Sequence, residues 1–319
     1  MKKLLKIIGY LVLLVIVVIG GFAAFISIRG VPSYDVNVPQ VAKIEVTPER
    51  VAHGKKIASM LCNNCHFNSA TGKFTGREMT EVPEFGKIVS RNITQDPEIG
   101  IGKWSDAQLT YFIRTGINPF TGKYSPPYMP KLMHISDEDL NSIIAFLHSD
   151  DPLVQADKTE GPVSEPSFLT KFLCLVAFKP FPFPEKPIPN PDTTNQLEWG
   201  KYLALYQLEC FACHSADFKK MNVFEPEKSL GFFGGGNVMR NDHGEMITTL
   251  NLTPDEETGI GKWTEEEFVK AVKFGIVPNG PALRNPMVPF AQLTDEEAKA
   301  IYAYLRTVPK IKHAISRGL

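Results

Sequence analysis

Cysteine is scarce in this sequence, with only 5 among 319 residues. Four of the five stand in two short motifs of identical spacing and Cys174 stands alone, so the fold does not rest on a disulfide framework. A strong net charge is also missing, because 34 basic residues are balanced by 35 acidic ones. With 43% hydrophobic residues, the chain is globular and lacks the basic surface that a nucleic-acid partner requires.

Charged residues are absent from Ile7 to Ile28, a run of 22 residues. At 1.5 Å per residue, a helix of this length crosses the ~30 Å hydrocarbon core of a bilayer. The alternative is a cleaved signal peptide, whose apolar region is normally ~7–15 residues and ends in small residues. The run is longer and Phe25–Arg29 lacks that signature, so we expect residues 1–30 to be an uncleaved, single-pass anchor. Lysines precede the run, which places the N-terminus in the cytoplasm and the remainder on the outer, periplasmic side.

The rest of the chain is one unit written twice. The first copy contains Cys62-Asn63-Asn64-Cys65-His66, then Asn92-Ile93-Thr94, then Gly100-Ile101-Gly102-Lys103-Trp104. The second contains Cys210-Phe211-Ala212-Cys213-His214, then Asn251-Leu252-Thr253, then Gly259-Ile260-Gly261-Lys262-Trp263. The interval from the cysteine motif to the asparagine is 11 residues longer in the second copy, which predicts an insertion in a loop there.

Helix signals occur at matched places in both copies. Ser105–Gln108 and Thr264–Glu267 are capping boxes, and the segments that follow them run to Gly116 and Gly275, which suit a helix C-cap. A last helix in each copy begins at Ser136 or Thr294 and has apolar residues at helical spacing. No comparable pattern favours a sheet, so we expect an all-α fold with tandem domains at residues 45–150 and 192–312 behind the transmembrane helix.

Residues 151–191 form a proline-rich linker between the copies, and its second half is an extended strap. Its first half contains Ser167–Phe178, an apolar stretch too short to cross a bilayer. We interpret this stretch as a helix packed on a domain or lying at the membrane surface. Cys174 within it is expected to be a buried, small hydrophobic residue.

The CxxCH motif indicates a covalently attached haem c. Its cysteines and histidine share one face of a helical turn, so both thiols reach one porphyrin while the imidazole coordinates its iron. A thioredoxin-like redox pair or half of a zinc site are the competing interpretations, but neither explains two such motifs, each followed by a matched methionine loop. We therefore predict two haem c groups, attached at Cys62, Cys65, Cys210 and Cys213, with His66 and His214 as iron ligands.

A methionine is the candidate for the sixth iron ligand in each copy. Met129 and Met287 lie in proline-rich loops, both seven residues before the cap of the last helix. Proline restricts such loops, so that a side chain can be held over one face of a haem. Met133 and His134 are rivals in the first copy, but the second copy has Ala291 and Gln292 at those positions. Methionine opposite histidine raises the haem potential and leaves no open position for a substrate.

These motifs resemble class I cytochrome c domains, most closely those of the cytochrome subunits of membrane-bound alcohol and sugar dehydrogenases. The resemblance covers about residues 45–150 and 192–310 and implies a small helical fold around each haem. It further implies His66 and His214 as proximal ligands and Met129 and Met287 as distal ones. The chain departs from that family in having two haem motifs where those subunits typically have three, and in its N-terminal anchor.

Electron transfer is the leading functional hypothesis. A dehydrogenase or quinol-linked donor would reduce one haem, and the other would pass the electron to an oxidase or a soluble cytochrome. The alternative is a dihaem enzyme, either a peroxidase or a thiosulfate dehydrogenase. A peroxidase needs an accessible sixth position, which two matched methionines disfavour. A thiosulfate-oxidising enzyme would use His or Cys at the catalytic iron, which makes His134 the residue to examine. The sequence predicts no catalytic residue.

Overall fold

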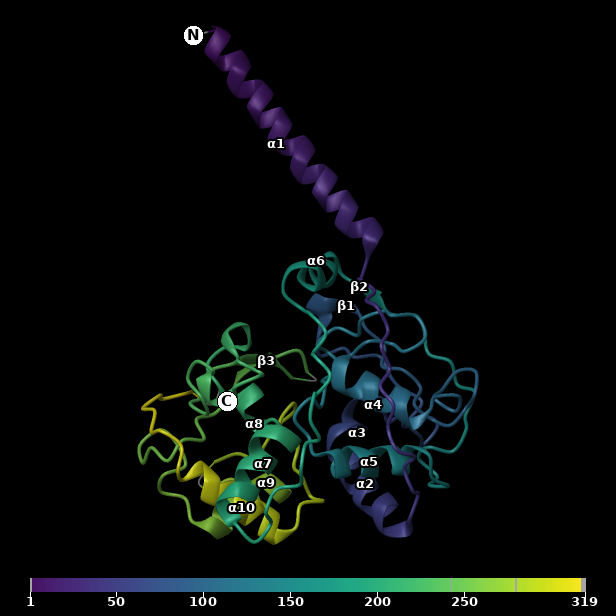
Figure 1. Ribbon diagram of the computed structural model, residues 1–319. Coiled ribbons are helices and arrows are strands. Elements are labelled where there is room, and N and C mark those ends of the chain that lie inside the picture. Colours follow the sequence, from purple (N-terminus) through teal and green to yellow (C-terminus); the bar gives the residue numbers. More distant parts are fainter. Residues whose placement is uncertain (1, 242, 279, 317–319) are drawn as a thin grey trace.

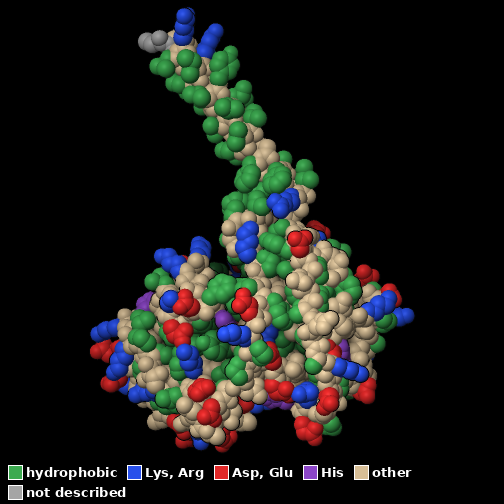
Figure 2. All heavy atoms as spheres, viewed as in Figure 1, with side chains coloured by type: hydrophobic (Ala, Val, Ile, Leu, Met, Phe, Trp, Pro, Cys, Tyr) green, Lys and Arg blue, Asp and Glu red, His purple; other side chains and the backbone are tan. Residues whose placement is uncertain are grey.

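A 28-residue helix, α1 (Lys2–Arg29), projects from a body of two helical lobes in the computed structural model, which describes residues 2–241, 243–278 and 280–316 (Figure 1). Apolar side chains cover α1 along its length, whereas charges of both signs cover the lobes (Figure 2). Ile26 is the buried residue of this helix. Within the described ranges, α1 is the one helix long and apolar enough to cross a membrane.

Each lobe is built from a similar set of helices. The first has α2 (Pro48–Leu61), α3 (Asn63–His66), α4 (Asp106–Thr115) and α5 (Asp137–Leu147), with the short 3-10 helix η1 (Pro83–Phe85). The second has α7 (Gln196–Tyr202), the π-helical turn η2 (Leu203–Gln207), α8 (Cys210–His214), the 3-10 turns η3 (Phe218–Lys220) and η4 (Pro226–Lys228), α9 (Glu265–Phe274) and α10 (Asp295–Leu305). The body is therefore mostly helical, as the sequence predicted.

Four short strands form two antiparallel pairs that the sequence did not signal. β1 (Gly86–Lys87) pairs with β2 (Glu165–Pro166), and β3 (Val238–Arg240) pairs with β4 (Met246–Thr248). The second pair lies within the longer interval of copy two. Strands of two or three residues are too short to show an alternating pattern, so they could not be predicted from the sequence.

The helix boundaries follow the capping signals of the sequence. Ser105 and Thr264 form complete capping boxes, and Gly116 and Gly275 close α4 and α9 in left-handed backbone at φ 79° and 74°. The last helices begin after Ser136 and Thr294, as predicted. Local chemistry alone therefore fixes where these helices begin and end.

One glycine in each copy lets two helices touch. A Cβ atom added to Gly54 of α2 would lie 1.7 Å from the carbonyl oxygen of Ser142 in α5. The equivalent Gly200 of α7 meets the carbonyl of Ala300 in α10, where the distance would be 1.8 Å. These glycines are required because the backbones cross in contact. The first helix of each copy is thereby held against the last.

Copy two contains two more residues than copy one between this glycine and the cysteine motif. The π-helical turn η2 and the next two residues absorb them, and Glu209, directly before Cys210, has left-handed backbone with a φ of 49°. A π-turn accommodates inserted residues without ending the helix. The turn η2 contacts both α8 and α10, so it connects the haem motif of copy two to α10 despite the insertion.

The two lobes meet through a matched pair of polar contacts. Lys56 Nζ donates to both carboxylate oxygens of Glu297, at 2.5 and 2.6 Å, and Tyr202 Oη donates to Asp139 Oδ2 at 2.5 Å. Lys56 and Tyr202 both lie two residues after the helix-contact glycine of their own copy. Both carboxylates belong to the third residue of the other copy's last helix. The same pair of positions therefore meets twice: the first helix of each copy contacts the last helix of the other.

The linker follows the first lobe before reaching the second. After β2, helix α6 (Phe168–Val176) begins at the cap residue Ser167 and packs against the end of α1 (Figure 1). Cys174 lies on the inner face of α6 and is fully buried, as expected. The proline-rich strap then contacts α4 and α5, where Phe181 N donates to Thr115 O at 3.2 Å and Asp137 N donates to Ile188 O at 2.9 Å.

Candidate haem-binding sites

The two CxxCH motifs form short helical turns, α3 and α8. In the first, His66 N donates to Cys62 O at 2.9 Å, so one turn joins the cysteines and the histidine. All five cysteines lie in the described part of the chain, and none is in a disulfide. Both histidines are buried, with exposed fractions of 6% for His66 and 8% for His214. The motif thiols are therefore available for bonds to a porphyrin.

Each motif histidine is oriented by one backbone carbonyl. His66 Nδ1 lies 2.7 Å from Arg91 O, and His214 Nδ1 lies 2.8 Å from Leu250 O. Burial lowers the pKa of both imidazoles, so the neutral form predominates. A neutral ring whose Nδ1–H donates to a carbonyl presents the Nε2 lone pair, which is the form that binds iron. The two sites fit a haem iron in the same way.

The Asn-x-Thr motif holds those carbonyls in place. In copy one, Asn92 Oδ1 accepts from Thr94 N at 2.8 Å, and Asn92 Nδ2 donates to Asp157 O and Thr159 O at 2.8 and 3.0 Å. In copy two, Asn251 Oδ1 accepts from Thr253 N at 2.9 Å, and its Nδ2 donates to Ile311 O at 2.7 Å. Arg91 and Leu250 directly precede these asparagines. The motif could be recognised in the sequence, but its role in positioning the carbonyl that contacts the histidine could not.

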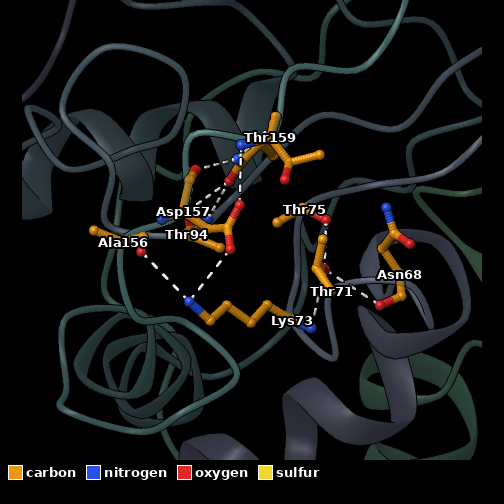
Figure 3. A network of polar contacts seen from close by, with 9 residues as sticks. Asn68, Thr71, Lys73, Thr75, Thr94, Ala156, Asp157 and Thr159 are labelled. Carbon is orange, nitrogen blue, oxygen red and sulfur yellow. Dashed lines mark hydrogen bonds and ion pairs between the residues drawn. The ribbon is translucent and has the colours of Figure 1, made fainter.

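The surrounding network in copy one binds the start of the linker to the haem-motif loop (Figure 3). Lys73 Nζ lies 3.3 Å from Asp157 Oδ2 and donates to Ala156 O at 3.4 Å. Asp157 N donates to Thr94 Oγ1 at 3.2 Å. Residues 156–159 therefore pack around Asn92 and hold it by hydrogen bonds, although they lie in the predicted linker.

Copy two brings its predicted ligands to one crevice. Cys213, His214 and Met287 line one crevice that opens to the surface. Its other walls are largely apolar and include Ile247 of β4 and Leu283. The thiol, imidazole and thioether donors, with an apolar wall, fit a haem c.

Copy one holds Met129 in the corresponding loop. Met129 N donates to Pro126 O at 3.1 Å, and Met287 N makes the equivalent turn to Arg284 O at 3.0 Å. The buried Lys131 adds a contact that copy two lacks, since its Nζ donates to Pro126 O at 2.8 Å and to Met129 O. Burial lowers the pKa of Lys131 to about 7. Lys131 was not predicted as a site residue, and its one signal in the sequence is a charge inside an apolar loop.

Of the two rivals for the sixth position in copy one, Met133 is buried and His134 contacts the other copy. Met133 is in the hydrophobic interior with 9% exposure. His134 Nε2 lies 3.0 Å from Val223 O of the other copy, and its ring centroid is 5.2 Å from that of Tyr206. His134 thus belongs to the interface between the lobes.

A second hollow lies between the copies. It is lined by Met60, Asn63 and Asn64 of copy one and by Val288, Pro289 and Phe290 of copy two. The first haem motif therefore faces the loop that follows Met287.

Glu209 is a further group near the second site that was not predicted from the sequence. It lies half-buried directly before Cys210, and desolvation raises its pKa to about 7.

Fold and site geometry together define a protein with two cytochrome c domains. Residues 203–309 match the family described as cytochrome c, and residues 49–147 match the family described as cytochrome c oxidase, cbb3-type, subunit III. The chain carries two covalently attached haem c groups, as predicted from its paired CxxCH motifs.

Several curated proteins are similar to most of the chain. The cytochrome c subunit of a quinone alcohol dehydrogenase from Gluconacetobacter polyoxogenes is 28% identical over 78% of this chain and 54% of its own length. The fructose dehydrogenase cytochrome subunit of Gluconobacter japonicus is 27% identical over 78% of this chain and 50% of its own. A dihaem c-type cytochrome from Cereibacter sphaeroides is 28% identical over 79% of this chain and 83% of its own. The chain thus spans about half the length of the dehydrogenase subunits.

Proposed function

We propose that this protein transfers electrons at the outer face of a membrane, between a dehydrogenase or quinol-linked donor and a terminal acceptor. The observation that supports this most directly is the matched geometry of the two histidines. Each is buried and neutral, and each is aimed by the carbonyl that precedes an Asn-x-Thr motif. Haem c supplies one-electron exchange at such a site, and the chain supplies its orientation and its low-dielectric surroundings.

The proposed attachment residues are Cys62, Cys65, Cys210 and Cys213. His66 and His214 are the proposed proximal ligands, and Met129 and Met287 the proposed distal ligands. Two protein ligands at each iron leave no position for substrate, which favours electron transfer over catalysis. The engagement of His134 by Val223 O weighs against the alternative, a dihaem peroxidase or thiosulfate dehydrogenase.

The hollow between Asn63 and Pro289 supports electron exchange between the two haems. The cysteine turn of one domain and the distal loop of the other face each other there. An electron accepted by one domain then needs no further protein to reach the other. We propose that the partners are a dehydrogenase, an oxidase or a soluble cytochrome, because the relatives include cytochrome subunits of alcohol and fructose dehydrogenases.

We further propose that α1 is a permanent, single-pass anchor with the N-terminus in the cytoplasm. Its 22 uncharged residues and the lysines before them support this topology. The proposed division of the chain is an anchor at residues 1–30, haem domains at 45–150 and 192–312, and a linker at 151–191. This topology places both haem domains outside the cytoplasm, which also suits covalent haem attachment on that side of the membrane.

Spectroscopic redox titration of the detergent-purified holoprotein tests the proposed function. We expect two one-electron transitions, no binding of cyanide to the resting protein and no turnover of peroxide. Co-purified or added dehydrogenase with its substrate should reduce both haems in sequence. Cyanide binding or peroxide turnover at one iron would instead establish the enzyme, and copy one would be the domain to examine first.

A further inference from the structure

Helix α6 lies beside the C-terminal end of α1 (Figure 1), and one of its faces exposes apolar side chains to solvent. Phe168, Leu169 and Val176 are 48%, 45% and 53% exposed. The opposite face is buried through Thr170 and Cys174. Thr170 Oγ1 donates to Phe85 O at 2.8 Å, which fastens this inner face to the first haem domain. An exposed apolar face on a well-anchored helix marks a binding surface.

The charge pattern of the α6 segment itself is one-sided, although Glu84 of η1 and Glu165 of β2 flank it. From Pro166 to Pro184 the chain contains no aspartate or glutamate, and its charged residues are Lys171 and Lys179. Hydrophobic side chains gather around the C-terminal end of α1 in Figure 2, with both basic and a few acidic side chains beside them. Phenylalanine and leucine with flanking lysines are the composition of helices that lie in the headgroup region of a bilayer.

The depth of α6 follows from its contact with α1. The 28 residues of α1 extend ~42 Å at 1.5 Å per residue, against a hydrocarbon core of ~30 Å. The last turn of α1, which ends at Arg29, therefore emerges at the headgroup level. Ile26 in that turn is buried, with 2% exposure, where α1 meets the lobe, and α6 is the helix packed there. The apolar face of α6 is thus continuous with the surface of α1 that faces lipid.

We propose that α6 lies in the interfacial region of the same bilayer that α1 crosses and binds phospholipid through Phe168, Leu169 and Val176. This inference rests on the proposed anchoring by α1. Its consequence is a fixed orientation of the first haem domain. Phe85, bonded to α6, contacts Tyr128 with ring centroids 6.1 Å apart, and Tyr128 directly precedes Met129. The Met129 side of the first domain is then held toward the membrane, where a membrane-bound donor would reach it.

Photo-crosslinking of the full-length holoprotein tests this placement. The protein is reconstituted in nanodiscs of phosphatidylcholine and phosphatidylglycerol that contain a phospholipid with a photoactivatable headgroup-proximal group, and adducts are mapped by mass spectrometry. We expect adducts on residues 168–176 as well as on the last turn of α1. Adducts on α1 without any on 168–176 overturn the inference and leave the anchor intact. No adduct on either segment overturns both, and crosslinks of 168–176 to a second copy of the chain replace lipid with a dimer contact.

A double variant, Phe168→Glu with Leu169→Glu, sharpens the test. These are the first two helical positions after the cap Ser167, where acidic residues stabilise a helix, so α6 remains folded. Adducts on 168–176 should fall several-fold while those on α1 persist. The matched control is Phe274→Glu, a 56% exposed phenylalanine in α9 of the second lobe, which should leave all adducts unchanged. Unchanged α6 adducts in the double variant would contradict the proposal, and an unaltered haem absorption spectrum verifies folding in each variant.

Discussion

Lys56 of the first domain and Glu297 of the second form a direct ion pair, with Nζ 2.5 Å from Oε1. Glu297 also caps α10, so the same carboxylate joins the two lobes and begins a helix. Its side chain is 10% exposed and that of Lys56 is 23% exposed, which distinguishes this pair from the surface pairs elsewhere on the molecule. The Tyr202–Asp139 contact repeats the relationship in the opposite direction. The lobes are therefore held by the carboxylate at the third position of each copy's last helix.

Replacing Lys56 by Met should destabilise the protein by ~2 kcal/mol, because the nearly buried Glu297 carboxylate loses its cationic partner. Thermal unfolding of the holoprotein, followed by haem absorbance, measures the effect. Lys103→Met is the matched control: Lys103 pairs with Glu98 within the first lobe at 2.5 Å, and the two side chains are 61% and 70% exposed. The control should cost less than ~1 kcal/mol. Equal losses in the two variants would contradict a special role for the interface pair.

Gly54→Ala and Gly200→Ala should each destabilise by ~1–3 kcal/mol or more, since the new methyl group would overlap a backbone carbonyl of the last helix. Denaturant unfolding gives the loss. Gly9→Ala in α1 is the control, because no atom lies within 4 Å of its added Cβ. A neutral Gly54→Ala would show that α2 and α5 are further apart than their contact indicates.

Asn92→Ala should raise the potential of the first haem and Asn251→Ala that of the second. Each change frees the carbonyl that accepts from the proximal histidine, which makes the imidazole a weaker donor to ferric iron. Lost buried hydrogen bonds should also cost ~1–3 kcal/mol of stability. Redox titration resolves the two haems, so each variant is the control for the other. If either substitution moved both potentials equally, a general loosening of the fold would explain it.

Met129→His and Met287→His should each retain the haem and lower its potential, because a thioether stabilises ferrous iron better than a second imidazole does. NMR of the reduced protein should show two sets of far-upfield methionine signals, with one set lost in each variant. Met133→Leu preserves the buried volume and should change neither potential. Disappearance of a signal set in Met133→Leu would assign the ligand to that residue.

Glu209 should make the potential of the second haem depend on pH near 7. Desolvation raises its pKa to about 7, so the carboxyl ionises as the pH rises through neutrality. A carboxylate near the haem stabilises the ferric form, and the potential should therefore fall with pH by at most ~59 mV per unit. Glu209→Gln should flatten this dependence. Copy one has Leu61 at the position before its motif and supplies the internal control.

The sequence by itself determined the local structure and the chemistry. Spacing in CxxCH places two thiols and an imidazole on one turn whatever surrounds them, and caps such as Ser105 and Thr264 act through their own neighbouring amides. Met129 and Met287 could be matched in the same way, because each lies seven residues before the cap of its last helix and such spacing can be read directly from the sequence. These features were predictable without knowledge of the fold.

Only the tertiary structure decided which distant groups meet. The carbonyls of Arg91 and Leu250 reach their histidines across 25 and 36 residues, and main-chain atoms have no sequence signature. The contact of α6 with α1 joins residues more than 130 positions apart. The pattern of apolar residues in 167–178 could not predict whether this helix would pack on a domain or lie at the membrane surface. The pairing of Lys56 with Glu297 spans 241 positions. Such contacts depend on how whole helices pack, and many sequences with these same local patterns would pack differently.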